Sequence, residues 1–303
     1  MLENYALKIA YLIDRDSVGG GMEYVRRQIA AHPNDECRVF FSDCGECAVA
    51  KVNAWGAELI HANHLKALVQ LYRNPFVRPH AKVVFTVHGI HWRKYGFLPR
   101  TFANRVKSIL RLRLERWLYA LVNELIALNR DDVEMLRTVY GVKCPTRLEP
   151  NAVLPVVADP REPEFAFVTV SRFDIQKGYD ILLAAIAAAQ DALRAARKRT
   201  LLIGGGEMLG AMKVFATEKG IGDLVEFAGE IPNAAEQMWR GRVLVAPSRW
   251  EGSPYAVLEA VARGKKVIAS ACPGNKDIVR DGENGWLFPV CDVKALAELL
   301  EKS

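Results

Sequence analysis

Short apolar, β-branched runs alternate along this chain with segments of helical periodicity, and this alternation constrains the fold more than any other feature. Strands that are each followed by a helix build a parallel sheet with helices on both faces. The pattern therefore predicts a doubly wound α/β architecture. The expected strands lie at residues 8–13, 37–41, 58–62, 82–89 and 124–129, then at 165–171, 200–206, 224–229, 243–248 and 266–270. Helices are expected to begin near Met22, Asp131, Tyr179, Met208, Ala234 and Pro254, with a final helix through Leu300.

The length of 303 residues favours two domains, because single hydrophobic cores rarely grow beyond about 250 to 300 residues. Four prolines interrupt residues 149–164 and predict a stiff connection there. We therefore expect one domain over residues 1–157 and a second over residues 158–303.

Composition and targeting signals predict a cytoplasmic protein. The chain is 50% hydrophobic and 25% charged, which is typical of soluble globular proteins. Its first residues, MLENYALKIAYLID, lack the basic and unbroken apolar regions of a signal peptide. Nowhere do about 18 apolar residues run together, as a membrane-spanning helix needs. Six cysteines without disulfide spacing suit a reducing compartment, and the Cys44/Cys47 pair lacks the second pair of a structural zinc site.

The net charge of +6 is concentrated in the first half of the chain. Residues 1–155 hold 22 Lys and Arg against 15 Asp and Glu, whereas residues 156–303 hold 19 against 20. Within residues 93–116, Glu115 is the only acid among eight cations. Apolar residues recur in the same stretch at helical spacing, which predicts a cationic amphipathic helix. These apolar residues are Phe102, Val106, Ile109, Leu110 and Trp117.

Two interpretations of this helix stay open. It packs one face on its own domain, or it docks on anionic lipid and makes the protein peripheral at the inner face of the cytoplasmic membrane. The candidate membrane-binding residues are Arg100, Arg105, Lys107, Arg111, Arg113 and Arg116. Nucleic acid is not an expected partner, because no helix-turn-helix, RNP or zinc-finger pattern occurs.

Several nucleotide-binding and catalytic motifs are absent. A dinucleotide fingerprint starting at Gly204 would need a third glycine where Leu209 stands. The run of glycines at 204–206 instead predicts a strand-to-helix turn in contact with a ligand. No GxxxxGK[ST] or GxSxG string occurs. We interpret the Asp-x-Asp triplet at Asp14 and Asp16 as a turn, so no metal site is expected.

Three places in the chain suit an anion or a sugar. Gly19, Gly20 and Gly21 precede an expected helix, whose first amides and dipole favour an anion. Arg172 and Lys177 lie just past an expected strand end and can converge on one anionic group such as a diphosphate.

The third place is the loop that ends in Glu251, Gly252, Ser253 and Pro254. Pro254 suits the first helical position and Ser253 suits the cap. Glu259 lies a little over two helical turns beyond Glu251 and can face the same cleft, or it forms an ordinary salt bridge on its helix.

The chain resembles the retaining glycosyltransferases of family 4, whose mark is two glutamates separated by seven residues, here Glu251 and Glu259. Further strings are similar to family blocks in the same order: TVHG, LNRDDVEML, EPNAVL, VSRFDIQKGYDILLAA, LLIGGGE, VEFAGEI, APSRWEGSPYAVLEAVARGKKVIAS and DGENGWLFP. The resemblance implies a GT-B fold, in which an acceptor-side and a donor-binding Rossmann-like domain face each other across a cleft.

The resemblance also implies roles for individual residues. Arg172 and Lys177 would bind the donor diphosphate, Glu259 the ribose hydroxyls, and Glu251 would lie by the donor sugar. His88 would face that sugar from the first domain. The backbone that would bind sugar hydroxyls or phosphate belongs to Gly252, Ser253, Pro254 and Tyr255, and the loop that would close over the phosphates contains Gly19, Gly20 and Gly21.

The implied reaction moves a hexose from a nucleotide-diphosphate sugar, with retention and without a metal or other cofactor, to a lipid-linked, lipopolysaccharide or capsule glycan. A UDP-sugar is the expected donor and GDP-mannose the next. Two alternatives remain. A nucleotide-sugar 2-epimerase has the same fold, and a non-catalytic sugar-nucleotide-binding subunit would suit a chain that ends at Ser303, where family members usually continue into a long helix.

Overall fold

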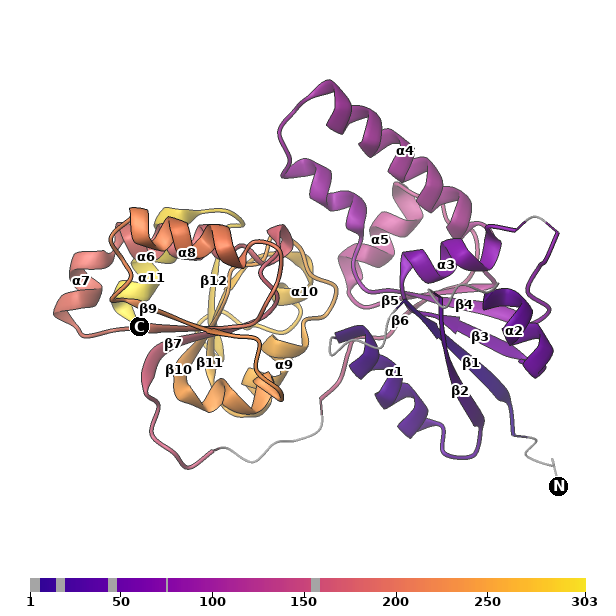
Figure 1. Ribbon diagram of the computed structural model, residues 1–303, viewed down its shortest axis with the longest axis horizontal. Helices are drawn as coiled ribbons and strands as arrows, with labels where there is room; N and C mark the ends of the chain where they lie inside the picture. Colours follow the sequence, from indigo (N-terminus) through magenta and orange to yellow (C-terminus); the bar gives the residue numbers. More distant parts are fainter. Residues whose placement is uncertain (1–5, 15–19, 43–47, 75, 154–158) are drawn as a thin grey trace. The chain divides into compact units, whose positions relative to one another are not determined.

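The protein forms two compact units in the computed structural model, Met1–Asn151 and Ala152–Ser303 (Figure 1). The structure describes residues 6–14, 20–42, 48–74, 76–153 and 159–303. The expected domain boundary at residues 157 and 158 lies outside these described residues.

The first unit is a parallel sheet with strand order β2-β1-β3-β4-β5-β6. Its strands are β1 (Lys8–Ile13), β2 (Glu36–Phe41), β3 (Leu59–Ala62), β4 (Lys82–Val87), β5 (Glu124–Ala127) and β6 (Thr146–Leu148). Its helices are α1 (Gly20–Ala31), α2 (Ala48–Trp55), α3 (Leu65–Tyr72), α4 (Phe102–Tyr119), α5 (Arg130–Thr138) and the 3₁₀ helix η1 (His91–Gly96).

The second unit repeats this plan, with strand order β12-β11-β10-β7-β8-β9 and all pairs parallel. Its strands are β7 (Phe165–Val170), β8 (Thr200–Ile203), β9 (Val225–Gly229), β10 (Gly241–Ala246), β11 (Lys266–Ser270) and β12 (Gly285–Phe288). Its helices are α6 (Tyr179–Ala188), α7 (Gln190–Ala195), α8 (Leu209–Glu218), α9 (Tyr255–Ala262), α10 (Pro273–Lys276), α11 (Val293–Lys302), and the 3₁₀ helices η2 (Ile175–Lys177) and η3 (Ala234–Arg240).

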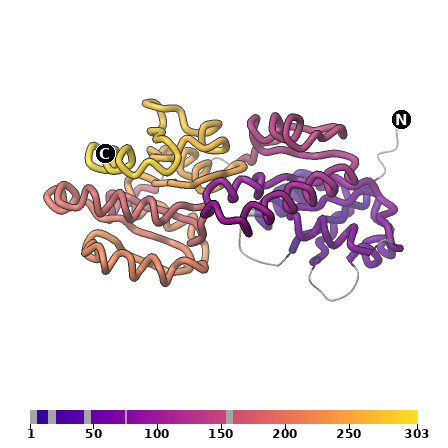
Figure 2. Tube along the Cα trace, turned by 90° about the horizontal axis from the view of Figure 1, so that it is seen from above, coloured from indigo at the N-terminus to yellow at the C-terminus, as the bar shows by residue number. Residues whose placement is uncertain are grey.

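The unbroken apolar runs of the central strands follow from this architecture. Successive residues of a strand point to opposite faces, and both faces of a doubly wound sheet are covered by helices. Phe167 belongs to one buried cluster of the second unit, and its neighbour Val168 belongs to the cluster on the other face. The C-terminal helix α11 packs beside α6 over the first of these faces (Figure 2). The predicted α/β architecture is confirmed in both units.

Several local predictions need correction. The segment from Ala234 is 3₁₀ and not α-helical; it follows Asn233, whose backbone is left-handed with φ 54°, and left-handed residues interrupt regular helices. The helix expected from Tyr179 ends at Ala188, and a second helix, α7, begins after Ala189. The short edge strands β6 and β12 were not predicted, because TRL and GWLF are not the uninterrupted apolar runs that indicated the other strands.

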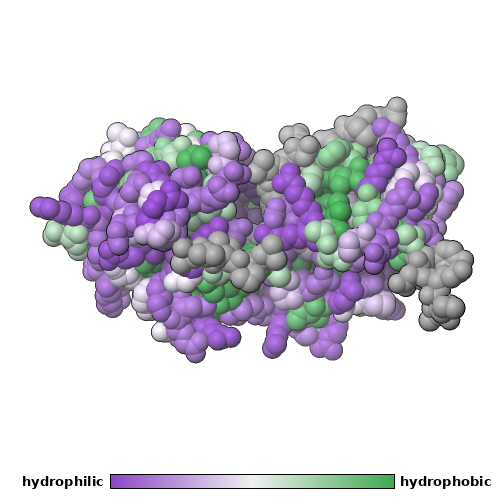
Figure 3. All heavy atoms as spheres, turned by 90° about the horizontal axis from the view of Figure 1, so that it is seen from below, coloured by the Kyte–Doolittle hydropathy of each residue, from purple (hydrophilic) through white to green (hydrophobic). Residues whose placement is uncertain are grey.

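Hydrophilic residues cover most of the face in Figure 3, and apolar residues gather there in separate patches. None of the described helices is long and apolar enough to cross a bilayer. Open α/β sheets bind ligands in the loops at the carboxyl ends of their strands.

Candidate functional site

The predicted donor residues gather where the strand order of the second sheet reverses. β7 and β10 are neighbours at its centre, and their connections leave toward opposite edges of the sheet. Such a switch point leaves a crevice at the carboxyl ends of the two strands. Arg172 and Lys177 follow β7, and Glu251 follows β10.

Lys177 and Glu251 form a largely buried ion pair at this point. Lys177 Nζ lies 2.6 Å from Glu251 Oε1, and the two side chains are 19% and 7% exposed. The carboxylate also accepts hydrogen bonds from Ser248 Oγ at 2.7 Å and from Gln176 Nε2 at 3.3 Å. Sequence analysis gave both residues a role at the donor but did not predict that they pair.

Local sequence explains how Lys177 reaches Glu251. Asp174 caps the 3₁₀ turn η2 by accepting a hydrogen bond from the Lys177 amide at 3.2 Å. The next residue, Gly178, is left-handed at φ 68°, and a Cβ there would lie 2.2 Å from the Pro247 carbonyl oxygen. Only glycine fits both conditions. The turn that carries Lys177 is therefore pressed against the end of β10.

Arg249 fixes the same turn from the β10 side. Its guanidinium binds both carboxylate oxygens of Asp180, at 2.9 and 2.6 Å, and the Ile175 carbonyl oxygen at 2.8 Å. Its amide also donates to the Gln176 carbonyl oxygen at 2.7 Å. A bidentate guanidinium–carboxylate pair is rigid as well as strong, so Arg249 holds η2 in register with the Glu251 loop.

A chain of buried hydrogen bonds supports Glu251 from the neighbouring strand β11. Ser270 Oγ donates to the Ser248 carbonyl oxygen, and Asn275 Nδ2 donates to Ser270 Oγ at 3.2 Å. All three residues are at most 3% exposed. Gly274 completes this support, because a Cβ there would lie 2.4 Å from the Gly252 carbonyl oxygen. Helix α10 therefore packs directly against the Glu251 loop.

Arg172 and Lys177 have different carboxylate partners. The Arg172 side chain is 74% exposed, and Nη2 lies 3.2 Å from Asp174 Oδ2. The glycine run of residues 204–206 packs on the backbone of this loop, because a Cβ at Gly204 would lie 1.9 Å from the Ser171 carbonyl oxygen. Close contact between two loops therefore explains Gly204 and Gly206, because a Cβ at Gly206 would likewise lie 2.6 Å from the Phe173 carbonyl oxygen. The ligand contact expected for this turn stays a prediction.

Helix α9 presents its N-terminus to the same region. Pro254 occupies the N-cap position and Tyr255 is the first helical residue, so Ser253 is not the cap that sequence analysis expected. A proline cap contributes no side-chain acceptor, so the first-turn amides do not receive a capping side chain from it. Gly252 and Ser253 are buried, and Glu259 is half-buried on α9.

The first unit collects polar side chains at the carboxyl edge of its own sheet. His88 follows β4 directly, and its Nε2 lies 3.4 Å from Asn63 Oδ1, which follows β3. Its ring packs edge-on against Tyr24 at 5.0 Å between centroids and beside His64 at 5.6 Å. A Cβ at Gly21 would lie 2.5 Å from the His64 ring, so the start of α1 rests on this cluster. Gly19 lies outside the described residues, and Gly20 begins α1.

Burial keeps His61 and His88 neutral. Desolvation lowers the pKa of His88 well below its ordinary value, and the nearby His64 lowers it further. Burial likewise lowers the pKa of His61 to about 3. His61 Nε2 forms a 2.7 Å hydrogen bond with Thr86 Oγ1, which in turn donates to the Tyr24 hydroxyl at 3.2 Å.

The predicted membrane residues do not share one environment. Arg111 pairs with buried Glu115 and is only 28% exposed, so it is a structural residue rather than part of an open surface. Arg93, from the same basic stretch, binds Asp132 of α5 at 2.9 Å. The remaining candidates, Arg100, Arg105, Lys107, Arg113 and Arg116, are exposed.

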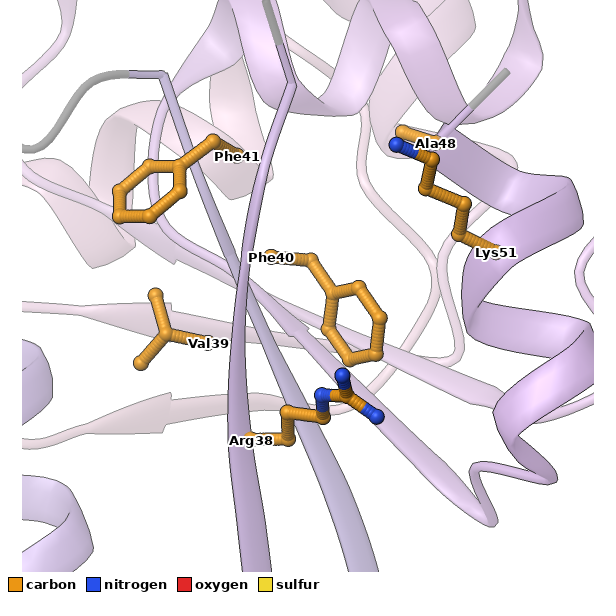
Figure 4. Close-up of a pocket in the computed structure, with 6 residues that line it drawn as sticks. All are labelled: Arg38, Val39, Phe40, Phe41, Ala48 and Lys51. Atoms are coloured by element: carbon orange, nitrogen blue, oxygen red, sulfur yellow. The ribbon is translucent and has the colours of Figure 1, made fainter. Parts of the chain in front are cut away.

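The Asp-x-Asp triplet, the cysteines and the depression on β2 add no residue to the candidate site. Asp14 accepts a hydrogen bond from Ser42 at 3.1 Å, and Asp16, Cys44 and Cys47 lie outside the described residues. Burial raises the pKa of the Cys272 thiol to about 12, which makes it a packing residue rather than a nucleophile. A depression on strand β2, beside α2, contains none of the predicted site residues; Figure 4 shows Phe40 and Arg38 on the α2 side of the strand.

Two protein families match consecutive parts of the chain. The family described as Glycosyltransferase Family 4 matches residues 21–155, and the one described as Glycosyl transferases group 1 matches residues 155–303. The chain belongs to glycosyltransferase family 4. Both units of this family 4 chain are thus accounted for, and its fold is GT-B.

Curated relatives are similar over part of their length. The EpsD protein of Bacillus subtilis strain 168 is 28% identical over 73% of this chain and 60% of its own length. The lipopolysaccharide core biosynthesis glycosyltransferase LpsE of Rhizobium meliloti strain 1021 is 28% identical over 45% of this chain and 38% of its own. The family 4 chain therefore spans less than two thirds of the length of each of these relatives.

Solved structures share the fold. Sucrose-phosphate synthase from Thermosynechococcus elongatus superposes with a TM-score of 0.80 at 23% identity, covering 98% of this chain and 89% of that one. Anabaena HepE in complex with UDP-glucose superposes with a TM-score of 0.76 at 21% identity and the same coverages. At such identities the similarity establishes the GT-B fold alone.

Sequence reasoning missed the residues that hold the site together. Ser248, Arg249 and Ser270 lie in one of the family-like strings but received no role, and Asn275, Asn63 and His64 were not singled out. The available signal was position, because all six residues lie at or within a few residues of a strand end, where a parallel sheet places its ligand-facing loops.

We predict that the buried histidines make the first unit sensitive to acid. His61 has a folded pKa of about 3 against an ordinary value of 6.5, so its contribution is complete above pH 6.5 and is lost as the pH falls toward 3. Unfolding at pH 5 then takes up a proton, and the free energy of unfolding falls by up to about 1.4 kcal/mol per pH unit for this group. Thermal unfolding of wild type and His61→Gln from pH 7 to 4.5 measures the difference in slope.

The exposed His32→Gln variant is the control for this experiment. Equal pH slopes for wild type and His61→Gln would contradict the assignment.

We also predict that Ser248→Ala destabilises the second unit by about 1.5–3 kcal/mol, since it removes a hydrogen bond to a buried carboxylate. Thr169→Val is the matched control, because it removes a buried hydroxyl that donates to a neutral carbonyl, that of Val245, at 3.0 Å. It should cost about 0.5–1.5 kcal/mol. Urea unfolding compares the two, and an equal loss would show that Ser248 gives Glu251 no special support.

Proposed function

We propose that this protein is a glycosyltransferase that moves a hexose from a nucleotide-diphosphate sugar to a glycan of the bacterial surface. The observation that carries the proposal is the Lys177–Glu251 ion pair, which lies at the switch point of the second sheet beside the N-terminus of α9. The family membership and the biosynthetic name of LpsE support a role in polysaccharide or lipopolysaccharide assembly.

The arrangement suits the charge that develops during transfer. Breaking the bond between the sugar and the nucleoside diphosphate leaves negative charge on the phosphate oxygens. An ammonium group has three N–H donors, so Lys177 can retain Glu251 and also donate to a phosphate. Exposed Arg172 can swing from Asp174 onto the same group, and the positive end of α9 adds a fixed dipole. Together these groups stabilise the leaving group without a metal ion.

Glu251 is suited to positioning rather than to attack. Its carboxylate holds Lys177 and accepts from Ser248 and Gln176, which commits its charge to neighbouring donors. In the proposed reaction it orients Lys177 and the donor sugar, while Glu259 on α9 binds the ribose hydroxyls. Retention of the anomeric configuration then follows from attack on the face that the phosphate leaves, and no enzymic nucleophile is assigned.

In this proposal His88 contributes an uncharged imidazole. Because its pKa is held well below the ordinary value, the ring stays neutral at physiological pH and can exchange hydrogen bonds with sugar hydroxyls. A cationic group there would oppose the positive charge that builds on the sugar ring. We assign a UDP-hexose as the donor, in keeping with the UDP-glucose bound by the structurally similar HepE.

We predict that Lys177→Ala weakens UDP binding by about 10- to 150-fold, the equivalent of a charge-assisted hydrogen bond of roughly 1.5–3 kcal/mol. Isothermal titration calorimetry of UDP measures this loss, and Lys294→Ala, an exposed change on α11, is the control. Removing Lys177 leaves a buried carboxylate, so Lys177→Met combined with Glu251→Gln tests the same contact in a neutral pair. Unchanged UDP affinity in both folded variants would refute the diphosphate assignment.

A thermal-shift panel tests donor choice and metal independence together. We expect UDP to raise the melting temperature more than GDP, dTDP or ADP, because a ligand at a hundred times its dissociation constant stabilises by about 2.7 kcal/mol. The shift should persist in EDTA. A shift restored only by Mg²⁺ or Mn²⁺ would contradict the metal-independent site, and UDP binding without turnover of any UDP-hexose would favour a sugar-nucleotide-binding subunit.

A further inference from the structure

Helix α4 turns an apolar stripe outward. Its exposed apolar residues stand at helical spacing, and Phe102, Leu110 and Trp117 are 83%, 58% and 48% exposed. Val106, Ile109 and Leu114 belong to the same stripe and are 37%, 50% and 37% exposed. Figure 1 shows the N-terminal turns of α4 farthest from the sheet of their unit.

The side of α4 opposite this stripe faces the protein: Leu118 and Tyr119 are buried in the core of the first unit, and Leu112 packs against that core. Trp92 Nε1 donates to Ser108 Oγ at 2.8 Å, which joins the middle of α4 to η1. Further along, Glu115 is 1% exposed and accepts hydrogen bonds from Arg111 and from the Tyr140 hydroxyl. Hydrogen bonds and a buried ion pair therefore anchor the helix, and they fix the apolar stripe in its outward orientation.

An ordinary surface helix packs its apolar residues on the core and points charge at water, whereas α4 carries a second apolar stripe that the core does not cover. Exposed apolar patches on soluble proteins mark surfaces that bind a partner or a membrane. Packing on its own domain, one of the two interpretations of the sequence, therefore does not describe this stripe.

The charge around the stripe selects an anionic partner. Arg113 lies within it, and Arg105 and Lys107 flank it on its two sides. Among the described residues, none of these three cations has a carboxylate within the 4 Å of an ion pair. A second copy of this chain would place the same cations opposite one another, which like-charge repulsion opposes. A bilayer with anionic headgroups satisfies both the apolar and the cationic residues.

We propose that α4 docks in the plane of an anionic lipid surface, with Phe102, Ile109, Leu110 and Trp117 in the headgroup region and the cations on the phosphates. This inference rests on the proposed transfer reaction, to which it adds the class of the acceptor. Through η1, α4 is joined to the loop after β4 that carries His88, so the docked protein holds the carboxyl edge of its first sheet near the lipid. The acceptor is then a lipid-carried glycan.

Sedimentation of the full chain with vesicles tests the docking without donor or acceptor. We expect binding to vesicles of 70% phosphatidylcholine and 30% phosphatidylglycerol, none to phosphatidylcholine alone, and release as salt rises. Neutralising three cations in Arg105→Gln/Lys107→Gln/Arg113→Gln should weaken the partition coefficient by roughly a hundredfold. Ile109→Ser/Leu110→Ser should weaken it by about tenfold or more. Because these side chains are exposed, both variants should melt like wild type.

Controls and a local reporter separate α4 from the rest of the surface. Val214→Ser removes an apolar residue on α8 that is 57% exposed, and it should leave binding unchanged. Brominated lipids should quench wild-type fluorescence, and Trp117→Phe should remove most of this quenching while the vesicles still bind. Undiminished binding in both α4 variants, or binding equal to both lipids, would overturn the proposal.

Sedimentation equilibrium without lipid tests the alternative that a second copy of this chain binds the stripe. A wild-type dimer that Ile109→Ser/Leu110→Ser dissociates, together with no vesicle binding, would identify the stripe as a contact between copies. The transfer reaction is measured on soluble donor, so it can fail or succeed independently of these results.

Discussion

The ion pair between Lys177 and Glu251 is the interaction on which the geometry of the donor side depends. Removing two charges from water is costly, and breaking such a pair typically costs about 3–5 kcal/mol. The pair persists because each partner is held separately. Gly178 and Arg249 fix the turn that carries Lys177, while Ser248, Ser270 and Asn275 support the Glu251 loop. The result is an ammonium group fixed beyond the end of β7, so the diphosphate binding proposed above would require little reorganisation.

Close approach of backbone segments is the second constraint, and it explains glycines that belong to no nucleotide-binding motif. Gly178 touches the carbonyl of Pro247, Gly204 that of Ser171, and Gly274 that of Gly252. Each contact joins the loop after one strand to the loop after a neighbour. A side chain at any of these positions would separate the loops and displace Lys177, Arg172 or Glu251, so the glycines act on the site through packing.

The two sheets share an architecture but present different electrostatics at their carboxyl edges. In the second unit, cations and carboxylates form ion pairs that are partly buried. In the first, histidines are held neutral by desolvation and surround the start of α1. In the proposed reaction, the charged groups of the second unit would bind phosphate, and the neutral groups of the first unit would contact uncharged hydroxyls. The outward apolar stripe of α4 adds a third environment, which the fold maintains through the buried Glu115.

Much of the fold follows from the sequence alone. Buried strands alternating with helices predict parallel sheets, and the strings around Lys177 and Glu251 are sufficient to indicate the family, because these patterns are local and repeat at fixed spacing. The sequence could not show that Lys177 pairs with Glu251, that Arg111 is anchored to Glu115 while Arg113 is exposed, or that α4 points an apolar stripe outward. Those outcomes depend on contacts between residues far apart in the chain or on which side of a helix meets the core. Periodicity identifies an amphipathic helix, but only tertiary packing decides which of its sides is buried.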